Sequence, residues 1–509
     1  MRKYCLLPLA FLIFMSGCAA NEIEDLPQGH GKEPDDKSIT LMFSFGSETL
    51  DPHLDWVPVR AGITETLVKI NEDLEIEPWL AESWEQVDDN TWEFKIKEDI
   101  TFHDGAQLDA QAAADSLERA FEVNPSIEAA LHIEEVEATD QTLVIHTKQP
   151  NPMLVSELVN PNTAITQVQT EEDIKTRPVG TGPFKVNDFE PNNSVHLIRF
   201  HEYWDGKAKV EEAYFTFNED NNVRGMSLQT NEADIAYHLS PESLDPIEQD
   251  ENLSVHSVPS MRTHFLMYQF NNPLLQDQTV REALDLLIDR ESAANDIMTG
   301  HADTASSPFH PSYSFGVYNE TVHSLNDAES LLQDDGWQQN EEGILEKEGQ
   351  VLDFTLITYG GRPELPLIAQ ILQGEASKIG INIEIQMVEN VDAYLEENDD
   401  WDLATYSNLT APRGDGGYFL NAAMMPDGAL NSGNVEEQEL IDLIEELNKT
   451  TDEEARKKLV KQAVSVIEAN TLQSYIIHPN IVVGVNDRVK NWEPGSEEYY
   501  MLNNELEVE

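Results

Sequence analysis

The side chains that could bind or transform a solute are few in kind. Both cysteines, Cys5 and Cys18, stand within the first 18 residues, so the rest of the chain holds no disulfide, no cysteine metal site and no cysteine nucleophile. The fourteen histidines include no H-x-x-x-H pair, and the sequence has neither an H-E-x-x-H nor a G-x-S-x-G motif. These patterns argue against a hydrolase and against a dedicated metal cage, so we expect no enzyme activity and no intrinsic cofactor.

The charge of the chain restricts its partners. Its 509 residues include 96 Asp and Glu against 31 Lys and Arg, a formal net charge of −65. Nucleic-acid binding and polybasic membrane contacts both need clustered cations, so neither is expected. Disorder is excluded by the 40% hydrophobic content and the 8% aromatic content. A folded chain this acidic suggests a saline habitat, where about 1 M salt shortens the Debye length to roughly 3 Å.

The N-terminus predicts the location. Met1, Arg2 and Lys3 precede an apolar run at 4–15, which is too short to span a bilayer because a span takes about 20 residues. The run ends in Ser16-Gly17-Cys18, which resembles a bacterial lipobox. We therefore expect 1–18 to be a lipoprotein signal peptide, Cys18 to carry lipid, and 19–37 to be a flexible tether on the extracellular face of the cell membrane. The alternative is an ordinary secretion signal with an incidental cysteine.

Strand and helix patterns alternate along the rest of the chain. Asp109 is a candidate N-cap, and Gly380 follows an expected helix. Pro479 separates two short strand segments, 474–477 and 481–485. The alternation favours an α/β fold. Expected strands are 91–97, 141–147, 352–358, 381–387 and 401–407, and expected helices are 110–121, 280–298, 326–333, 365–378, 436–447 and 451–469.

A series of short motifs resembles one family throughout the chain. The family is that of the extracellular solute-binding proteins of the peptide/nickel class (solute-binding protein family 5), which serve ABC importers, and the resemblance is nearest to its nickel-binding branch. The matching segments are Leu50-Asp51-Pro52-His53, Glu65-Thr66-Leu67-Val68, 78–84, 102–110, Gly180-Thr181-Gly182-Pro183, Tyr203-Trp204-Asp205-Gly206 and 280–290. They occur in family order from about residue 40 to 490, and most have the composition of structural turns and core segments.

The resemblance implies a two-lobed, periplasmic-binding-protein-like fold of type II with discontinuous lobes. Residues 38–75, 172–270 and 480–509 would form lobe I. Residues 76–171 would be a subdomain inserted into lobe I, and 271–479 would form lobe II. A ligand would lie between the lobes.

The resemblance also implies where that ligand binds. Nickel-binding members take a metal already wrapped by small carboxylate-bearing chelators, so the protein needs cations and an imidazole. Arg413 and Tyr418 lie on a Gly-rich loop, 410–420, and an arginine there offers a fork for a carboxylate. Arg262 and His264 precede an apolar run. The alternative is that Arg413 pairs with Asp415, and Arg262 with a surface acid.

Two departures from the family pattern leave the identity of the ligand open. Some nickel-binding members have a histidine where Gly416-Gly417-Tyr418 stands here, and some have an arginine near Asn160-Pro161-Asn162. We expect a nickel chelate, with a different chelator or a short peptide as the alternative ligand. Lobe closure would bury the ligand and present the protein, as a monomer, to an ABC permease. The rival classes are an extracellular hydrolase, which activity assays would reveal, and an adhesion protein, which would not compact on binding ligand.

Overall fold

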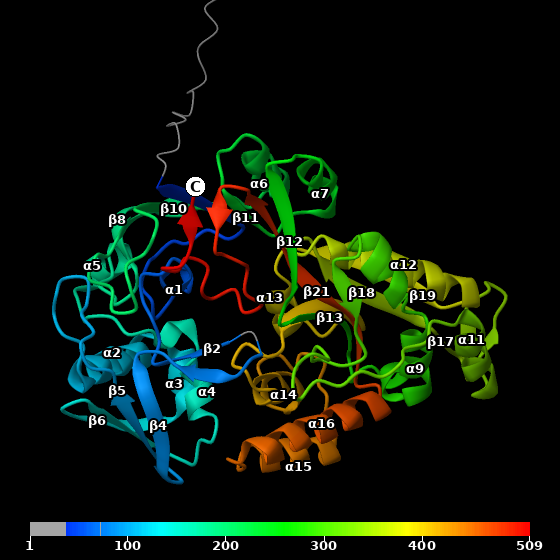
Figure 1. Cartoon of the computed structure of the whole chain (residues 1–509). Helices are drawn as coiled ribbons and strands as arrows, with labels where there is room; N and C mark the ends of the chain where they lie inside the picture. The colour runs from blue at the N-terminus through cyan, green and yellow to red at the C-terminus, as the bar shows by residue number, and fades with distance from the viewer. Residues whose placement is uncertain (1–36, 72) are drawn as a thin grey trace, which may run out of the picture. The chain divides into compact units, whose positions relative to one another are not determined.

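One mixed β-sheet of twelve strands dominates residues 37–71 and 73–509, the part of the chain that this computed structural model describes (Figure 1). Its main path runs β19-β18-β20-β13-β21-β11-β1-β10-β9-β8, and β12 and β14 pair with β21 beside that path. The predicted signal peptide 1–18 with Cys18, and the predicted tether up to residue 36, lie outside the described residues.

The half of the sheet that ends at β8 contains the first strand of the chain. β1 pairs in parallel with β10 and β11, and β9 and β8 continue the sheet in antiparallel fashion. Ile39, Leu41 and Phe43 alternate with half-buried residues along β1 and enter a core shared with Phe215, as the two-residue period of a strand requires. This half comprises β1 (Ser38–Phe43), β8 (Phe184–Glu190), β9 (Ser194–Arg199), β10 (Glu212–Phe217), β11 (Ile235–Tyr237), β12 (Leu253–Pro259), α6 (Asn221–Gln229) and α7 (Pro241–Glu248).

The other half of the sheet is built around a parallel pair of strands. β18 and β19 pair in parallel and are connected by α12, as a parallel connection requires, so the predicted strand, helix and strand at 352–387 are confirmed. Gly380 ends α12 with φ +91°, where a side chain would be strained. This half comprises β13 (Arg262–Tyr268), β14 (Ala302–Thr304), β18 (Asp353–Tyr359), β19 (Asn382–Val388), β20 (Leu403–Leu409), α8 (Pro273–Gln276), α11 (Leu325–Asp334) and α12 (Glu364–Ile379).

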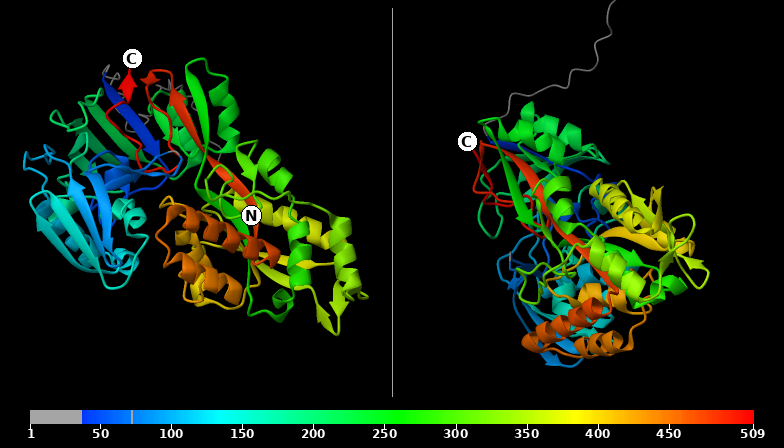
Figure 2. Two further views of the ribbon diagram at one scale, coloured as in Figure 1. Left: turned by 60° about the horizontal axis from the view of Figure 1, so that its bottom comes forward. Right: turned by 90° about the vertical axis from the view of Figure 1, so that its right-hand side faces the viewer.

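Strand β21 (Gln473–Asn486) belongs to both halves of the sheet, and its orange-red ribbon continues from one half into the other (Figure 2). The prediction of two segments broken by Pro479 is therefore wrong. β13 pairs with β21 up to Ile477, and β12 pairs with it from Asn480 onward. Pro479, which has no N–H to donate, lies between the residues of β21 that pair with β13 and those that pair with β12. Its carbonyl accepts a hydrogen bond from Ser260.

The single helix predicted at 280–298 is also wrong. The structure has α9 (Gln278–Leu286), α10 (Arg290–Ser292) and a π-helical turn at Ala293–Ile297. The side chain of Asp289 accepts a hydrogen bond from the backbone N–H of Ser292 and so starts a new helix. Arg290 then donates to the carbonyls of Ala305 and Tyr475, which fixes the direction of the second segment.

A separate four-stranded sheet lies within residues 76–171, with the order β4-β5-β7-β6. Helix α2 packs on its strands β6 and β7 and begins at Asp109, whose side chain accepts from the N–H of Ala112, so the predicted N-cap is confirmed. The predicted strands at 91–97 and 141–147 are confirmed as β5 and β7. The elements here are β4 (Ala81–Asp88), β5 (Thr91–Ile96), β6 (Ile133–Thr139), β7 (Thr142–Thr147), α2 (Ala110–Val123), α3 (Pro125–Leu131), α4 (Leu154–Glu157) and a 3₁₀ turn (Pro161–Thr163), and α5 (Glu171–Thr176) follows this region.

The predicted helices at 436–447 and 451–469 are confirmed as α15 (Gln438–Leu447) and α16 (Glu453–Ala469), which lie side by side in two views (Figures 1 and 2). None of the helices within residues 37–71 and 73–509 combines the length and apolar character needed to cross a bilayer. The remaining elements are α1 (Val57–Arg60), β2 (Val68–Ile70), β3 (Ile76–Pro78), β15 (Gln338–Gln339), β16 (Leu345–Lys347), β17 (Gln350–Val351), α13 (Val391–Glu397), α14 (Gly417–Met424), β22 (Val489–Lys490) and β23 (Glu507–Val508).

Candidate ligand-binding site

The loop between β20 and α14 buries Arg413 instead of exposing it. Its backbone is fixed at the start, where the N–H of Thr410 donates to the carbonyl of Met261 over 2.8 Å. Gly414 has φ +69°, and a Cβ there would stand 2.5 Å from the carbonyl oxygen of Leu74. Glycine is therefore required at this position by both its backbone angle and its close contact, and Arg413 beside it is only 8% exposed.

The acidic partner of Arg413 is Glu157, at the end of α4. The Nε atom of Arg413 lies 3.0 Å from Oε2 of Glu157, and both side chains are about nine-tenths buried. The Nη1 atom is buried and has no hydrogen-bond partner among the described residues. Burial alone would lower the pKa of Arg413, but the Glu157 carboxylate, together with Tyr499 and Tyr418, outweighs burial and raises it, so the guanidinium stays charged.

Asp415, the alternative partner of Arg413, is taken by another arginine. Its two carboxylate oxygens each accept from Arg456 at 3.0 Å, in a bidentate ion pair. The same carboxylate also accepts the N–H of Gly417 at the start of α14. Asp415 therefore shapes the loop and leaves Arg413 to other partners.

Aromatic side chains surround the guanidinium of Arg413. Its central carbon lies 5.2 Å from the ring centre of Tyr418, a cation–π distance. The hydroxyl of Tyr499 donates to the carbonyl of Pro412 over 3.0 Å, and its ring meets Trp56 edge to face at 5.5 Å. The indole N–H of Trp56 in turn donates to Oδ1 of Asn162, over 2.8 Å. Apolar walls of this kind lower the local dielectric and strengthen an ion pair formed inside them.

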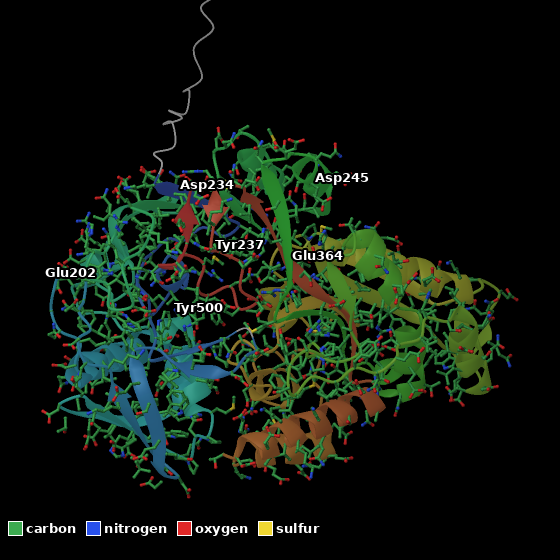
Figure 3. The ribbon with its side chains drawn as sticks, viewed as in Figure 1. Glu202, Asp234, Tyr237, Asp245, Glu364 and Tyr500 are labelled. Atoms are coloured by element: carbon green, nitrogen blue, oxygen red, sulfur yellow. The ribbon has the colours of Figure 1, made fainter. Side chains whose placement is uncertain are left out.

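The structure places His264 against an acid. Its Nε2 atom lies 2.7 Å from Oε1 of Glu364, the first residue of α12, which Figure 3 labels. The side chain of His264 has no exposed surface. Burial lowers the pKa of His264, which favours a neutral ring whose Nε2–H donates to the carboxylate. Burial alone would raise the pKa of Glu364, but His264 and the nearby charge of Arg362 together outweigh burial, and the pKa falls to about 2. His264 therefore positions Glu364.

Arg262 shares the face of β13 that carries His264. Its Nη1 atom donates to Ser407 on the neighbouring strand, at 3.3 Å from the hydroxyl oxygen and 3.4 Å from the carbonyl oxygen. Burial lowers the pKa of Arg262 to about 10, and the nearby charge of Arg362 adds to the effect. The carboxylates of Glu498 and Glu364 partly oppose this effect on the pKa of Arg262, and Glu498 is also hydrogen-bonded to His238.

Several side chains of this candidate site could not be predicted from the sequence. Glu157 and Tyr499 reach Arg413 and its loop from distant parts of the chain, Trp56 packs on Tyr499, and no local pattern marks these residues. Arg362 carries the same signal that marked Arg413, an arginine next to glycines in a loop before a helix. The described residues contain no group of three or more His, Cys, Asp or Glu side chains arranged to hold a metal ion.

Comparisons with known proteins agree with one another. Residues 75–429 match the family described as bacterial extracellular solute-binding proteins, family 5 Middle. The nickel-binding protein NikA of Staphylococcus aureus is 34% identical over 474 residues, which are 93% of this chain and 94% of that protein. A solved nickel ABC transporter protein from Bacillus halodurans is 44% identical, with a TM-score of 0.82, over 93% of this chain and 100% of that one.

A second solved structure, that of NikA from Staphylococcus aureus in complex with Ni(L-His)2, is 34% identical. It superposes with a TM-score of 0.80 over 93% of this chain and all of that chain. The expected fold class, the two-lobed type II binding protein of mixed α/β structure, is confirmed by these matches.

Proposed function

Because the chain belongs to the bacterial extracellular solute-binding proteins of family 5, a family of binding proteins and not of enzymes, we propose that it captures nickel as a small carboxylate-bearing chelate. The bound chelate is then delivered to the permease of an ABC importer. Capture proceeds by closure of the two lobes around the ligand, which removes it from water. Lipid on Cys18 keeps the protein at the extracellular face of the membrane.

One observation carries this proposal: the buried guanidinium of Arg413, whose Nη1 atom has no hydrogen-bond partner among the described residues. A buried donor without a partner costs free energy, and an arriving carboxylate would satisfy it with a charge-assisted bond. Tyr418 and the aromatic pair of Tyr499 and Trp56 give the planar groups of a chelate surfaces to pack against.

The chelator, and not the protein, supplies most of the metal donors in this proposal. His264 has its Nε2 atom bonded to Glu364 and lies fully buried, so it is committed to a structural hydrogen bond. The arginines instead recognise the carboxylates that the chelator presents outward. Such a division fits the complex of the Staphylococcus aureus relative, whose nickel is bound by L-histidine.

Titration calorimetry tests the proposed ligand. Nickel(II) mixed with two equivalents of L-histidine should bind the wild-type protein at one site with a Kd of about 1 µM or below, which corresponds to about −8 kcal/mol. Nickel(II) alone and L-histidine alone should bind far more weakly. Binding of a short peptide such as trialanine, with no binding of the nickel–histidine mixture, would make the protein an oligopeptide receptor and overturn the proposal.

Replacement of Cys18 by serine tests the anchor. A serine cannot form the thioether that carries lipid, so Cys18→Ser should move the protein from the membrane fraction to the soluble fraction of cells. Mass spectrometry of the wild-type N-terminus should show a lipid-modified cysteine. A wild-type protein with an unmodified N-terminus would show that 1–18 is an ordinary secretion signal.

A further inference from the structure

Arg413 and Glu157 form a buried pair whose charges cancel before any ligand arrives. The Nε atom of Arg413 lies 3.0 Å from Oε2 of Glu157, and both side chains are buried. Charges held in a low-dielectric interior act on one another, and on a ligand beside them, more strongly than charges in water do. The cation proposed to hold a ligand carboxylate therefore has its own counter-charge beside it.

Direct packing of α4 against α14 fixes the position of Glu157. The N–H of Met153 donates to Oδ1 of Asn151 over 3.1 Å, just before α4 begins. A Cβ at Gly417 would stand 3.0 Å from the sulfur of Met153, so the start of α4 lies directly against the start of α14. Glu157, at the other end of the short helix α4, is thereby held beside the loop that carries Arg413.

The other charged side chain of this loop is also countered. Residues 410–420 contain two charged side chains, Arg413 and Asp415, and Asp415 forms its bidentate ion pair with Arg456. Together with their partners, these charges sum to zero. The Nη1 atom of Arg413 nevertheless has no hydrogen-bond partner among the described residues, so the pair still offers a donor to a ligand.

A neutral pair and a lone cation favour different ligands. A lone guanidinium would attract any small anion, chloride included. Beside Glu157, a ligand with a net negative charge meets repulsion from a buried carboxylate, whereas a ligand whose carboxylates are balanced by its own metal does not. Two L-histidine ligands balance the charge of nickel(II), while two L-aspartate ligands leave the complex with two negative charges.

We propose that Glu157 determines the specificity of the site, which accepts nickel chelates that are neutral overall and rejects anionic ones. This inference rests on the function proposed above and narrows its ligand class to chelates whose carboxylates are balanced by the metal. The net charge of −65 on the chain repels anionic ligands as well. Salt screens that surface repulsion far more than it screens a buried charge, so the two contributions can be separated.

The affinities of the wild type for two complexes of similar size test the proposal. The probes are nickel(II) with two equivalents of L-histidine and nickel(II) with two equivalents of L-aspartate, which share an amino-acid backbone and differ in overall charge. Titration calorimetry in about 1 M salt, where the Debye length is roughly 3 Å, removes most of the surface repulsion. The aspartate complex should still bind at least about tenfold more weakly, a difference of 1.4 kcal/mol or more. Equal affinities for the two complexes would overturn the proposal.

Glu157→Gln separates the effect of charge from that of ligand shape, because glutamine keeps the size of the side chain and removes its charge. The measured quantity is the Kd of the aspartate complex divided by that of the histidine complex, and this ratio should fall at least about tenfold. Glu128→Gln is the matched control. It removes the same charge from the neighbouring helix α3, where the side chain is 54% exposed, and it should leave the ratio unchanged.

Three outcomes decide between the possible roles of Glu157. An unchanged ratio in Glu157→Gln, whether both affinities change or neither does, would show that Glu157 only shapes the loop or competes with every ligand carboxylate, and would overturn the proposal. Because this substitution leaves a buried guanidinium without its counter-charge, the melting temperature is measured as well. The wild-type comparison decides the question even where the variant is unstable. A wild type that binds neither complex would overturn the proposed function itself.

Discussion

Arg413→Ala should weaken the binding of the nickel–histidine complex at least tenfold. A charge-assisted hydrogen bond contributes roughly 1.5–3 kcal/mol, and 1.4 kcal/mol is a factor of ten in affinity. Arg413→Lys should recover only part of the affinity, because an ammonium cannot form the bidentate fork. Titration calorimetry of the three proteins with the same probe measures the effect, and equal affinities would show that Arg413 is only structural.

Arg413→Ala should also affect the stability of the fold, because Arg413 forms a buried ion pair with Glu157. Glycine neighbours such as Gly414 are typical of an exposed loop, where a substitution would be harmless, but the structure buries the side chain of Arg413 against Glu157. Removing one member of a buried ion pair leaves the other uncompensated, at a cost of about 3–5 kcal/mol. The matched background is Glu157→Gln, which already leaves Arg413 without its carboxylate, so that adding Arg413→Ala strands no further buried charge. The pair Glu157→Gln and Glu157→Gln/Arg413→Ala should therefore show the loss of affinity without a large loss of melting temperature.

Local patterns in the sequence were enough to predict most of the elements near the site. The side chain of Asp109 caps α2 and Gly380 ends α12, because caps depend on the chemistry of one or two residues. The break near Asp289 was missed since the apolar period continues across it, and a side-chain hydrogen bond decides where the helix restarts. The break predicted at Pro479 was wrong because a strand can contain a proline where one partner strand stops pairing and the next begins. That position depends on the partner strands β13 and β12, not on the local sequence.

Several of the family motifs are joined to one another by hydrogen bonds. Glu65 is fully buried and accepts hydrogen bonds from Thr181, Tyr203 and Trp204, which come from two other resembling segments. Thus the Gly-Thr-Gly-Pro and Tyr-Trp motifs are joined through one carboxylate. The proposed ligand site depends instead on pairs such as Arg413 with Glu157, which are 256 positions apart in the chain. No local pattern contains such a pair, so only the cations of the site could be predicted.

His478 should make the protein markedly less stable in acid. It lies on β21 beside Pro479, is 2% exposed, and its Nδ1 atom lies 3.0 Å from the hydroxyl of Thr263. Burial lowers its pKa to about 3, and the rings of His310 and His264 add to the effect. In the unfolded chain His478 binds a proton near pH 6.5, whereas in the folded chain it does not. The contribution of His478 to the free energy of unfolding is therefore complete above pH 6.5 and is lost as the pH drops toward 3.

The expected loss is about 1.4 kcal/mol per pH unit in this window, or roughly 3 kcal/mol between pH 6.5 and 4. His53 and His103, whose pKa values burial lowers to about 4, act in the same direction. Glu65 acts in the opposite direction because burial raises its pKa, and falling net charge also relieves repulsion. Comparison with a single variant removes these shared contributions.

His478→Asn is the informative variant, because its amide can reach the hydroxyl of Thr263 but does not titrate. The free energy of unfolding is measured with urea in about 1 M salt, which shortens the Debye length to roughly 3 Å. Between pH 6.5 and 4 it should decline less steeply for the variant than for the wild type. His201→Asn is the control, since that side chain is exposed and its substitution should leave the slope unchanged. If His478→Asn and the wild type decline in parallel, the buried imidazole is not what makes the fold sensitive to acid, and a proton must be reaching it in the native state.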